Sequence, residues 1–156
     1  MIPKIKRVLY TTDLSENSAF AFRYAMNTAE KHDAEMIILH VIEEIPPSVR
    51  AYMFDRDLTG LKKEATDELN RRLDQFCESE LRERPECMKR IKRTKVVEGY
   101  PAEVILSVAD EENCDIIIMG THGKGVISHT FLGSVAERVL RRTRKPVFVI
   151  PLPPDM

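Results

Sequence analysis

The sequence has few of the features that mark membrane, secreted or nucleic-acid-binding proteins. In its 156 residues no apolar run approaches the roughly 20 residues that a membrane-spanning helix needs. The amino-terminal stretch also lacks the apolar core of a signal peptide. The formal net charge is −1, which argues against general electrostatic capture of nucleic acid or of an anionic membrane. These absences predict a cytoplasmic protein with no nucleic-acid partner and no membrane partner.

Cysteine is also scarce. The chain holds three cysteines, an odd number without metal-ligand spacing: Cys77, Cys87 and Cys114. We expect reduced thiols that pack as small hydrophobic side chains. The remaining composition, 43% hydrophobic and 31% charged, is ordinary for a globular protein, and the length predicts one domain over residues 1–156.

Strand-like apolar segments alternate with helical patterns along the chain. The predicted strands are residues 5–12, 36–42, 94–98, 116–119 and 147–150. The predicted helices begin near residues 15, 58, 101 and 134. This alternation predicts right-handed βαβ units, a parallel sheet and a three-layer α/β sandwich with helices on both faces.

Two stretches between the predicted elements carry open alternatives. Residues 43–57 are irregular, and Tyr52, Met53 and Phe54 in them either cover a ligand or partner, or pack against the core. The basic stretch Lys89–Lys95 has no interleaved aromatic residues, so we interpret it as a solvated lead into the third strand rather than as a nucleic-acid patch.

The most informative stretch is residues 115–135, DIIIMGTHGKGVISHTFLGSV. A buried strand ends at Gly120, Gly123 follows in the loop, and Gly133-Ser134 opens the last helix. Strand, glycine turn, loop and helix start build a pocket for an anion, because exposed N–H groups and the positive end of the helix dipole both favour a phosphate. In the simpler alternative, these glycines only make turns.

The motif differs from two common nucleotide fingerprints. Val126 stands where a Walker lysine belongs, and Ser128 stands where a dinucleotide motif has its third glycine. The spacing resembles the ATP-binding signature of the universal stress protein family, which Gly120, Gly123 and Gly133-Ser134 match. The run GYPAEVIL at residues 99–106 also resembles that family, and the resemblance extends over nearly the whole chain.

The resemblance implies a five-stranded parallel sheet with strand order 3-2-1-4-5. This order puts the first and fourth strands side by side at the centre. It therefore brings Asp13 and the loop after Gly120 to the same carboxyl edge of the sheet, at the topological switch point.

The resemblance also implies a set of nucleotide-binding residues. They are Thr12, Asp13, Val41, Met119, Gly120, His122, Gly123, Lys124, Gly133, Ser134 and Val135. We expect the backbone of Val41 to hold adenine, and the N–H groups of Gly123, Gly133 and Ser134 to hold phosphates.

Four of the polar residues at this edge have alternative interpretations. Asp13 also suits a helix cap, and the two roles are compatible. Lys124 either neutralises phosphate charge or is an exposed loop lysine. His122 and His129 lack a nucleophile or carboxylate at recognisable spacing, so we predict no catalytic residue.

A protein of this family with the complete glycine motif is expected to be a small cytoplasmic ATP-binding stress-response regulator. Its nucleotide state would alter its interaction with a protein partner. ATP is the expected ligand, with AMP and ADP as alternatives, and a divalent cation such as Mg²⁺ is compatible with the site although its ligands are unknown. Two other functions stay open: an enzyme that hydrolyses ATP or transfers its phosphoryl or nucleotidyl group, and a dimeric interaction module with a vestigial pocket.

The last strand predicts a homodimer. Val147, Phe148, Val149 and Ile150 are apolar without alternation, so we expect both faces of this strand to be buried. The implied strand order puts it at a sheet edge, where pairing with a second copy across a two-fold axis would satisfy its unpaired N–H and C=O groups.

Overall fold

The computed structural model describes residues 1–44, 46–51, 58–80, 85–121 and 132–151. The strands are β1 (Arg7–Thr12), β2 (Glu35–Glu43), β3 (Ile91–Gly99), β4 (Ile116–Gly120) and β5 (Val147–Ile150). The helices are α1 (Glu16–His32), α2 (Pro47–Arg50), α3 (Leu58–Glu80), α4 (Pro101–Glu111) and α5 (Ser134–Arg142), and residues Pro85–Arg90 form a 3₁₀ helix.

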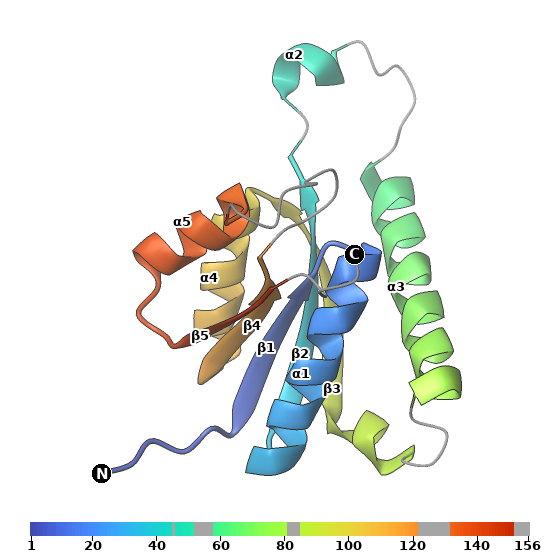
Figure 1. Ribbon diagram of the computed structural model, residues 1–156. Coiled ribbons are helices and arrows are strands. Elements are labelled where there is room, and N and C mark those ends of the chain that lie inside the picture. The colour runs from blue at the N-terminus through green and yellow to red at the C-terminus, as the bar shows by residue number, and fades with distance from the viewer. Residues whose placement is uncertain (45, 52–57, 81–84, 122–131, 152–156) are drawn as a thin grey trace.

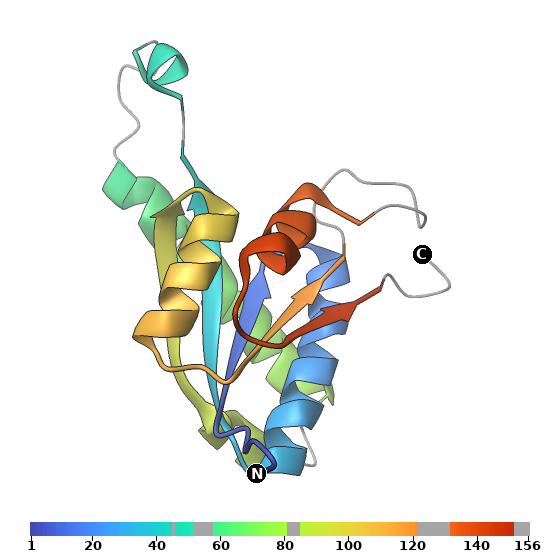
Figure 2. The ribbon, with the colours of Figure 1, turned by 90° about the vertical axis from the view of Figure 1, so that its left-hand side faces the viewer.

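The five strands form one parallel sheet with the order β3-β2-β1-β4-β5. Helices α1 and α3 cover one face of the sheet, and α4 and α5 cover the other (Figures 1 and 2). The predicted three-layer α/β fold and its strand order are therefore confirmed. Within the described ranges, no helix combines the length and the apolar character needed to cross a membrane.

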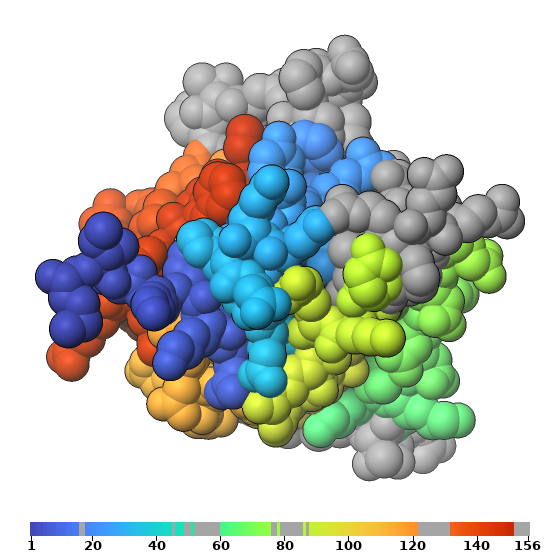
Figure 3. All heavy atoms as spheres, turned by 90° about the horizontal axis from the view of Figure 1, so that it is seen from below, coloured from blue at the N-terminus to red at the C-terminus, as the bar shows by residue number. Residues whose placement is uncertain are grey.

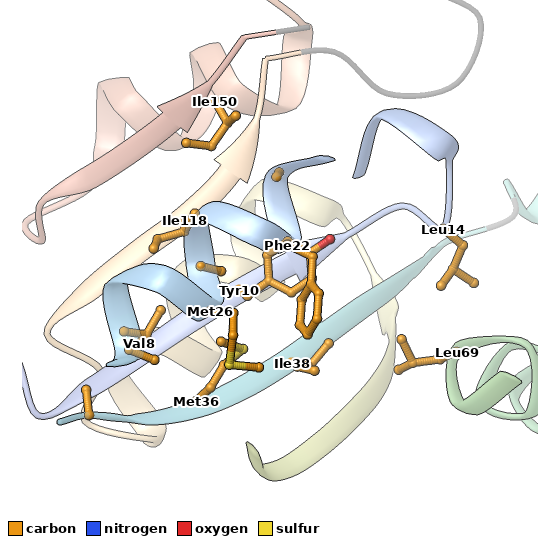
Figure 4. Close-up of a cluster of buried hydrophobic side chains, with 14 of the residues drawn as sticks. Val8, Tyr10, Leu14, Phe22, Met26, Met36, Ile38, Leu69, Ile118 and Ile150 are labelled. Atoms are coloured by element: carbon orange, nitrogen blue, oxygen red, sulfur yellow. The ribbon is translucent and has the colours of Figure 1, made fainter. Parts of the chain in front are cut away.

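The core consists of two apolar layers, one on each face of the sheet. Alternate residues of β1 enter different layers: Val8 and Tyr10 face α1, whereas Leu9 faces α4 and α5. In the layer below α1, the rings of Tyr10 and Phe22 are 5.2 Å apart between centroids (Figure 4). Burial on both faces is what the central strand of a parallel sheet requires, and it explains the continuous apolar runs in the sequence.

Helix α1 has a side-chain N-cap and a buried core stripe. Phe22, Ala25, Met26 and Ala29 recur at the spacing of one helix face, and all four are buried. Ser15 is the N-cap, because its Oγ accepts a hydrogen bond from the N–H of Ser18 at 3.2 Å.

Two details differ from the sequence-based expectation. The segment expected to be irregular after β2 contains the short helix α2, whose first residue is Pro47, a residue well suited to a first helical turn. Strand β3 begins at Ile91 instead of Thr94, so most of the basic stretch is strand. Tyr52, Met53 and Phe54 lie outside the described residues.

The basic residues of β3 fit a strand because acidic residues of neighbouring elements neutralise them. Lys92 pairs with Glu35 of β2 at 3.2 Å, and Lys95 pairs with the buried Glu112 carboxylate at 3.3 Å. Seen from the amino ends of the strands, the start of β2 (cyan) lies against the start of β3 (yellow-green) (Figure 3). These pairs join segments that lie far apart in the sequence.

Strand β5 is not buried on both faces within one chain, which corrects that part of the expectation. Ile150 is buried, but Phe148, which lies on the same α1 face of the strand, is 40% exposed. Its ring meets that of Tyr24 on α1 edge to face at a centroid distance of 6.0 Å, and Tyr24 is exposed to a similar degree. The edge of the sheet at β5 thus presents an exposed aromatic pair.

Two glycines give a matched test of this packing. At Gly99, φ is +155° and a Cβ would lie 2.7 Å from Cγ2 of Val104, whereas a Cβ at Gly60 in α3 would meet open space. We expect Gly99→Ala to lower the free energy of unfolding by about 1–3 kcal/mol. Gly60→Ala should raise it by up to about 1 kcal/mol. Urea denaturation measures both, and equal effects of the two substitutions would contradict the packing at Gly99.

Candidate functional site

The candidate site lies at the carboxyl edge of the sheet, where β1 and β4 are neighbours. The chain leaves β1 into α1 on one face and leaves β4 towards α5 on the other face (Figure 1). Open parallel α/β sheets bind their ligands in the crevice that this divergence creates. The structure therefore brings the ends of β1 and β4 together as predicted.

Three of the expected apolar residues come together below this edge. Met119 near the end of β4 is buried in the layer covered by α4 and α5. Val41 of β2 and Val135 in the first turn of α5 are partly buried and pack against that layer. Residues from three separate elements thus build an apolar surface on the α5 side of the sheet.

A hydrogen bond joins Thr121 and Gly133, the residues at the two ends of the loop between β4 and α5. Thr121 donates its N–H to the carbonyl of Ile150 at 2.9 Å, and its own carbonyl accepts the N–H of Gly133 at 2.7 Å. The expected phosphate donor of Gly133 is therefore used to close the loop. The other expected loop residues, His122, Gly123 and Lys124, lie outside the described residues, as does His129.

The start of α5 supplies the remaining N–H groups. Gly133 is the N-cap and offers no side chain to bond them. The first hydrogen bond within the helix runs from the N–H of Glu137 to the carbonyl of Gly133. The N–H groups of Ser134, Val135 and Ala136 precede it, and such groups have no partner inside a helix. An anion at this edge would satisfy them and meet the positive end of the helix dipole.

At the end of β1, Asp13 and Ser15 form a compact turn. Oδ1 of Asp13 accepts from the backbone N–H of Ser15 at 2.9 Å and from its Oγ at 2.5 Å. Ser15 then caps α1. The capping role considered for Asp13 thus belongs to Ser15, and Asp13 holds the cap residue in position at the same edge as Gly120.

Thr12 points its side chain away from the apolar surface on the α5 side. Its Oγ1 accepts from Oγ of Ser18 at 2.5 Å and from the N–H of Leu14 at 3.0 Å. The hydroxyl of Tyr10 donates to the carbonyl of Ser18 at 2.6 Å. Side chains alternate along a strand, so Thr12 shares the α1 face with Tyr10. From β1, the carboxyl edge of the sheet therefore receives the backbone of Thr12 and not its hydroxyl.

Sequence reasoning missed two residues that fix this edge. Nδ1 of His40 donates to the carbonyl of Thr12 at 2.8 Å, across the β1–β2 pairing in which these residues are opposite each other. Ser18 links the Tyr10 and Thr12 hydroxyls. The position of Ser18, three residues after the cap residue Ser15, was a visible signal in the sequence. The contact of His40 with Thr12 could be found only from the strand register.

Two further kinds of group could carry chemistry among the described residues: the buried thiol and clusters of metal-ligating side chains. Cys114 is buried and its pKa is raised to about 11, first because burial disfavours the thiolate, which fits the inert role predicted for it. Among the described residues, no group of three or more histidine, cysteine, aspartate or glutamate side chains is placed to hold a metal ion.

The strand order, the switch point and the loop that closes at α5 define an open parallel α/β protein with a ligand edge at the carboxyl ends of β1 and β4. Residues 4–151 match the model of the universal stress protein family, and the chain belongs to that family.

Similar proteins agree with this assignment. Universal stress protein MJ0577 of Methanocaldococcus jannaschii is 34% identical over 153 residues, which cover 93% of this chain and 94% of that protein. The solved structure of MJ0577 superposes with a TM-score of 0.72 and covers 95% of this chain and 96% of that one. UspA of Lactobacillus plantarum, at 22% identity, shares the fold with a TM-score of 0.73 over 96% of this chain and 99% of that one.

The buried hydroxyl of Tyr10 predicts a pH dependence of stability. Burial raises the pKa of this hydroxyl from 10.0 to about 12. In the unfolded chain the tyrosine ionises near pH 10, so the stabilisation is complete below that pH and is lost as pH rises through 12. The stability advantage of the parent over Tyr10→Phe should therefore shrink by about 1.4 kcal/mol between about pH 9 and about pH 11. Urea unfolding of both proteins measures it, and an unchanged difference would show that Tyr10 is not held in its neutral form.

Proposed function

We propose that this protein is a small cytoplasmic regulator that binds ATP at the carboxyl edge of β1 and β4. The observation that carries the proposal is the convergence of three kinds of group at one edge. The first turn of α5 offers N–H groups to phosphate, and Asp13 brings a carboxylate. Below them lies the apolar surface of Val41, Met119 and Val135. These groups match the phosphates, the ribose hydroxyls and the base of an adenine nucleotide.

In this proposal each part of the nucleotide has a partner. The phosphates lie at the N–H groups of Ser134 and Val135, where the dipole of α5 favours negative charge. Asp13 accepts from a ribose hydroxyl or binds a metal ion that accompanies the phosphates, such as Mg²⁺. The backbone at Val41 meets the adenine ring. Gly123 and Lys124 complete the phosphate site from the loop.

A known structure supports the choice of an adenine nucleotide. A universal stress protein solved in complex with cAMP shares this fold with a TM-score of 0.64, at 22% identity over 97% of this chain and 100% of that one. Because that identity is low, the comparison supports the fold and the ligand class rather than individual contacts. ATP is our choice because the glycine motif is complete in this sequence.

We further propose that nucleotide binding alters the interaction of this protein with a protein partner. The candidate site contains a helix start suited to phosphate, and the Ser15 hydroxyl beside the Asp13 carboxylate is used to cap α1, which favours binding over turnover. Turnover of ATP by the parent well above that of a pocket variant would instead assign an enzyme.

The edge strand β5 supports a homodimer. The two edges of the sheet differ: β3 carries Lys92, Arg93 and Lys95, whereas β5 carries no charge. Charged residues on an edge strand discourage pairing with another chain, so β3 is protected and β5 is not. Pairing of β5 with its copy would satisfy its backbone groups and cover the exposed rings of Phe148 and Tyr24.

Gly133→Val tests the nucleotide site. Gly133 has φ −63° and ψ 154°, angles that valine adopts readily, so the substitution adds side-chain bulk at the start of α5 without backbone strain. We expect ATP affinity to fall at least tenfold, about 1.4 kcal/mol, with little change in the melting temperature. Calorimetry of parent and variant measures it, with Gly60→Val in α3 as the control that leaves ATP binding unchanged. Equal affinity of the parent and Gly133→Val would remove the proposed site.

Val149→Lys tests the dimer. Light scattering on gel-filtered protein should give about twice the chain mass for the parent, because two uncharged edges pair across a two-fold axis. A lysine on β5 should shift the mass towards that of one chain, and Thr94→Lys on β3 is the matched control that leaves it unchanged. A parent that stays monomeric at high micromolar concentration would rule out this interface.

A further inference from the structure

A cavity of about 240 Å³ lies on the α1 side of the sheet, between α1 and α3. Its apolar wall includes Leu14, Phe22, Leu69 and Leu73, and the first three of these side chains are largely buried. Figure 4 shows Leu14 and Leu69 approaching this space from the turn after β1 and from α3. The cavity exists because α1 packs on the centre of the sheet, whereas α3 packs towards β2 and β3.

The size of the cavity limits its occupant. An engineered apolar cavity of about 150 Å³ accommodates benzene, so this larger space has room for a ring with a substituent or for a short alkyl chain. A helix or strand of a partner protein, about 10 Å across with its side chains, does not fit. The occupant is therefore a small molecule.

Positive charge at the cavity favours an acid group on that molecule. Arg23 of α1 and Arg72 of α3 both line the space, from opposite helices. Nε of Arg72 donates to Glu68 at 2.7 Å, and the same carboxylate also accepts from Arg71. The Glu68 carboxylate is thus shared by two guanidinium groups. The hydrogen bond from Arg72 to Glu68 uses one of the five N–H donors of Arg72. A carboxylate ligand would meet charge-assisted donors at this place.

We propose that this cavity is a second ligand site for a small amphiphilic anion, such as a medium-chain or aromatic carboxylate. The hydrocarbon part lies against Leu14, Phe22, Leu69 and Leu73, and the acid group lies at Arg72. This site is distinct from the nucleotide edge, because it opens on the α1 face whereas Met119 and its apolar neighbours lie on the α5 face.

The cavity also includes Thr12 and Ser15, which flank Asp13 in the turn after β1. A ligand in the cavity would contact this turn from the α1 side of the sheet. The same turn positions Asp13 at the carboxyl edge. The second site does not depend on nucleotide binding and stands if the nucleotide proposal fails.

Octanoate and 1-octanol test the charge requirement, since they share a chain length and differ in the head group. Calorimetry should show octanoate binding at least about fivefold more tightly than the alcohol. Arg72→Gln should remove this preference, and Arg141→Gln on the exposed surface of α5 should keep it. No binding of octanoate at low-millimolar concentration, or equal binding of acid and alcohol, would overturn the proposal.

Two further variants and an NMR measurement test whether octanoate binds in this cavity. Ala19 is exposed and lines the cavity, so Ala19→Phe should fill its mouth and abolish octanoate binding, whereas Asn27→Phe, at an exposed position further along α1, should leave it intact. In the parent, octanoate should shift the methyl resonances of Leu14, Leu69 and Leu73 but not those of Leu9 in the opposite layer. Methyl shifts confined to other regions would overturn the assignment even if Ala19→Phe failed to fold.

Discussion

The burial of β1 between two apolar layers is the constraint on which the rest of this structure depends. Its residues Val8, Leu9 and Tyr10 are all buried, and the strand pairs with β2 on one edge and β4 on the other. A strand enclosed on four sides carries most of its polar chemistry at its two ends, and at its carboxyl end the backbone turns into α1. The hydroxyl network of Tyr10, Thr12 and Ser18 and the turn at Asp13 both follow from that position.

Most of the architecture could be predicted because the apolar runs and the helical stripes are strong local signals. The stripe from Phe22 to Ala29 and the strand before Gly120 needed no tertiary information. The start of β3 was missed because its basic residues obscure the strand pattern. They are tolerated through pairs such as Lys92–Glu35, whose partners are 57 residues apart in the sequence.

The sequence predicted which residues lie at the candidate site better than it predicted what each residue does there. The glycine motif located Gly120 and Gly133 at one edge, but only the fold shows that the N–H of Gly133 closes the loop on Thr121. Likewise, Thr12 belongs to the edge through its backbone, because strand alternation turns its hydroxyl towards α1. Long-range hydrogen bonds and side-chain direction decide these roles, and neither can be read from spacing alone.

The central claim is that an adenine nucleotide binds across the ends of β1 and β4. An amide-resolved NMR titration of the parent protein with ATP tests this most directly. The account predicts saturable shifts at the amides of Asp13, Val41 and Thr121 and in the first turn of α5, with the amino ends of the strands unchanged. Saturable shifts confined to other parts of the chain, or no shifts at millimolar ATP, would contradict it.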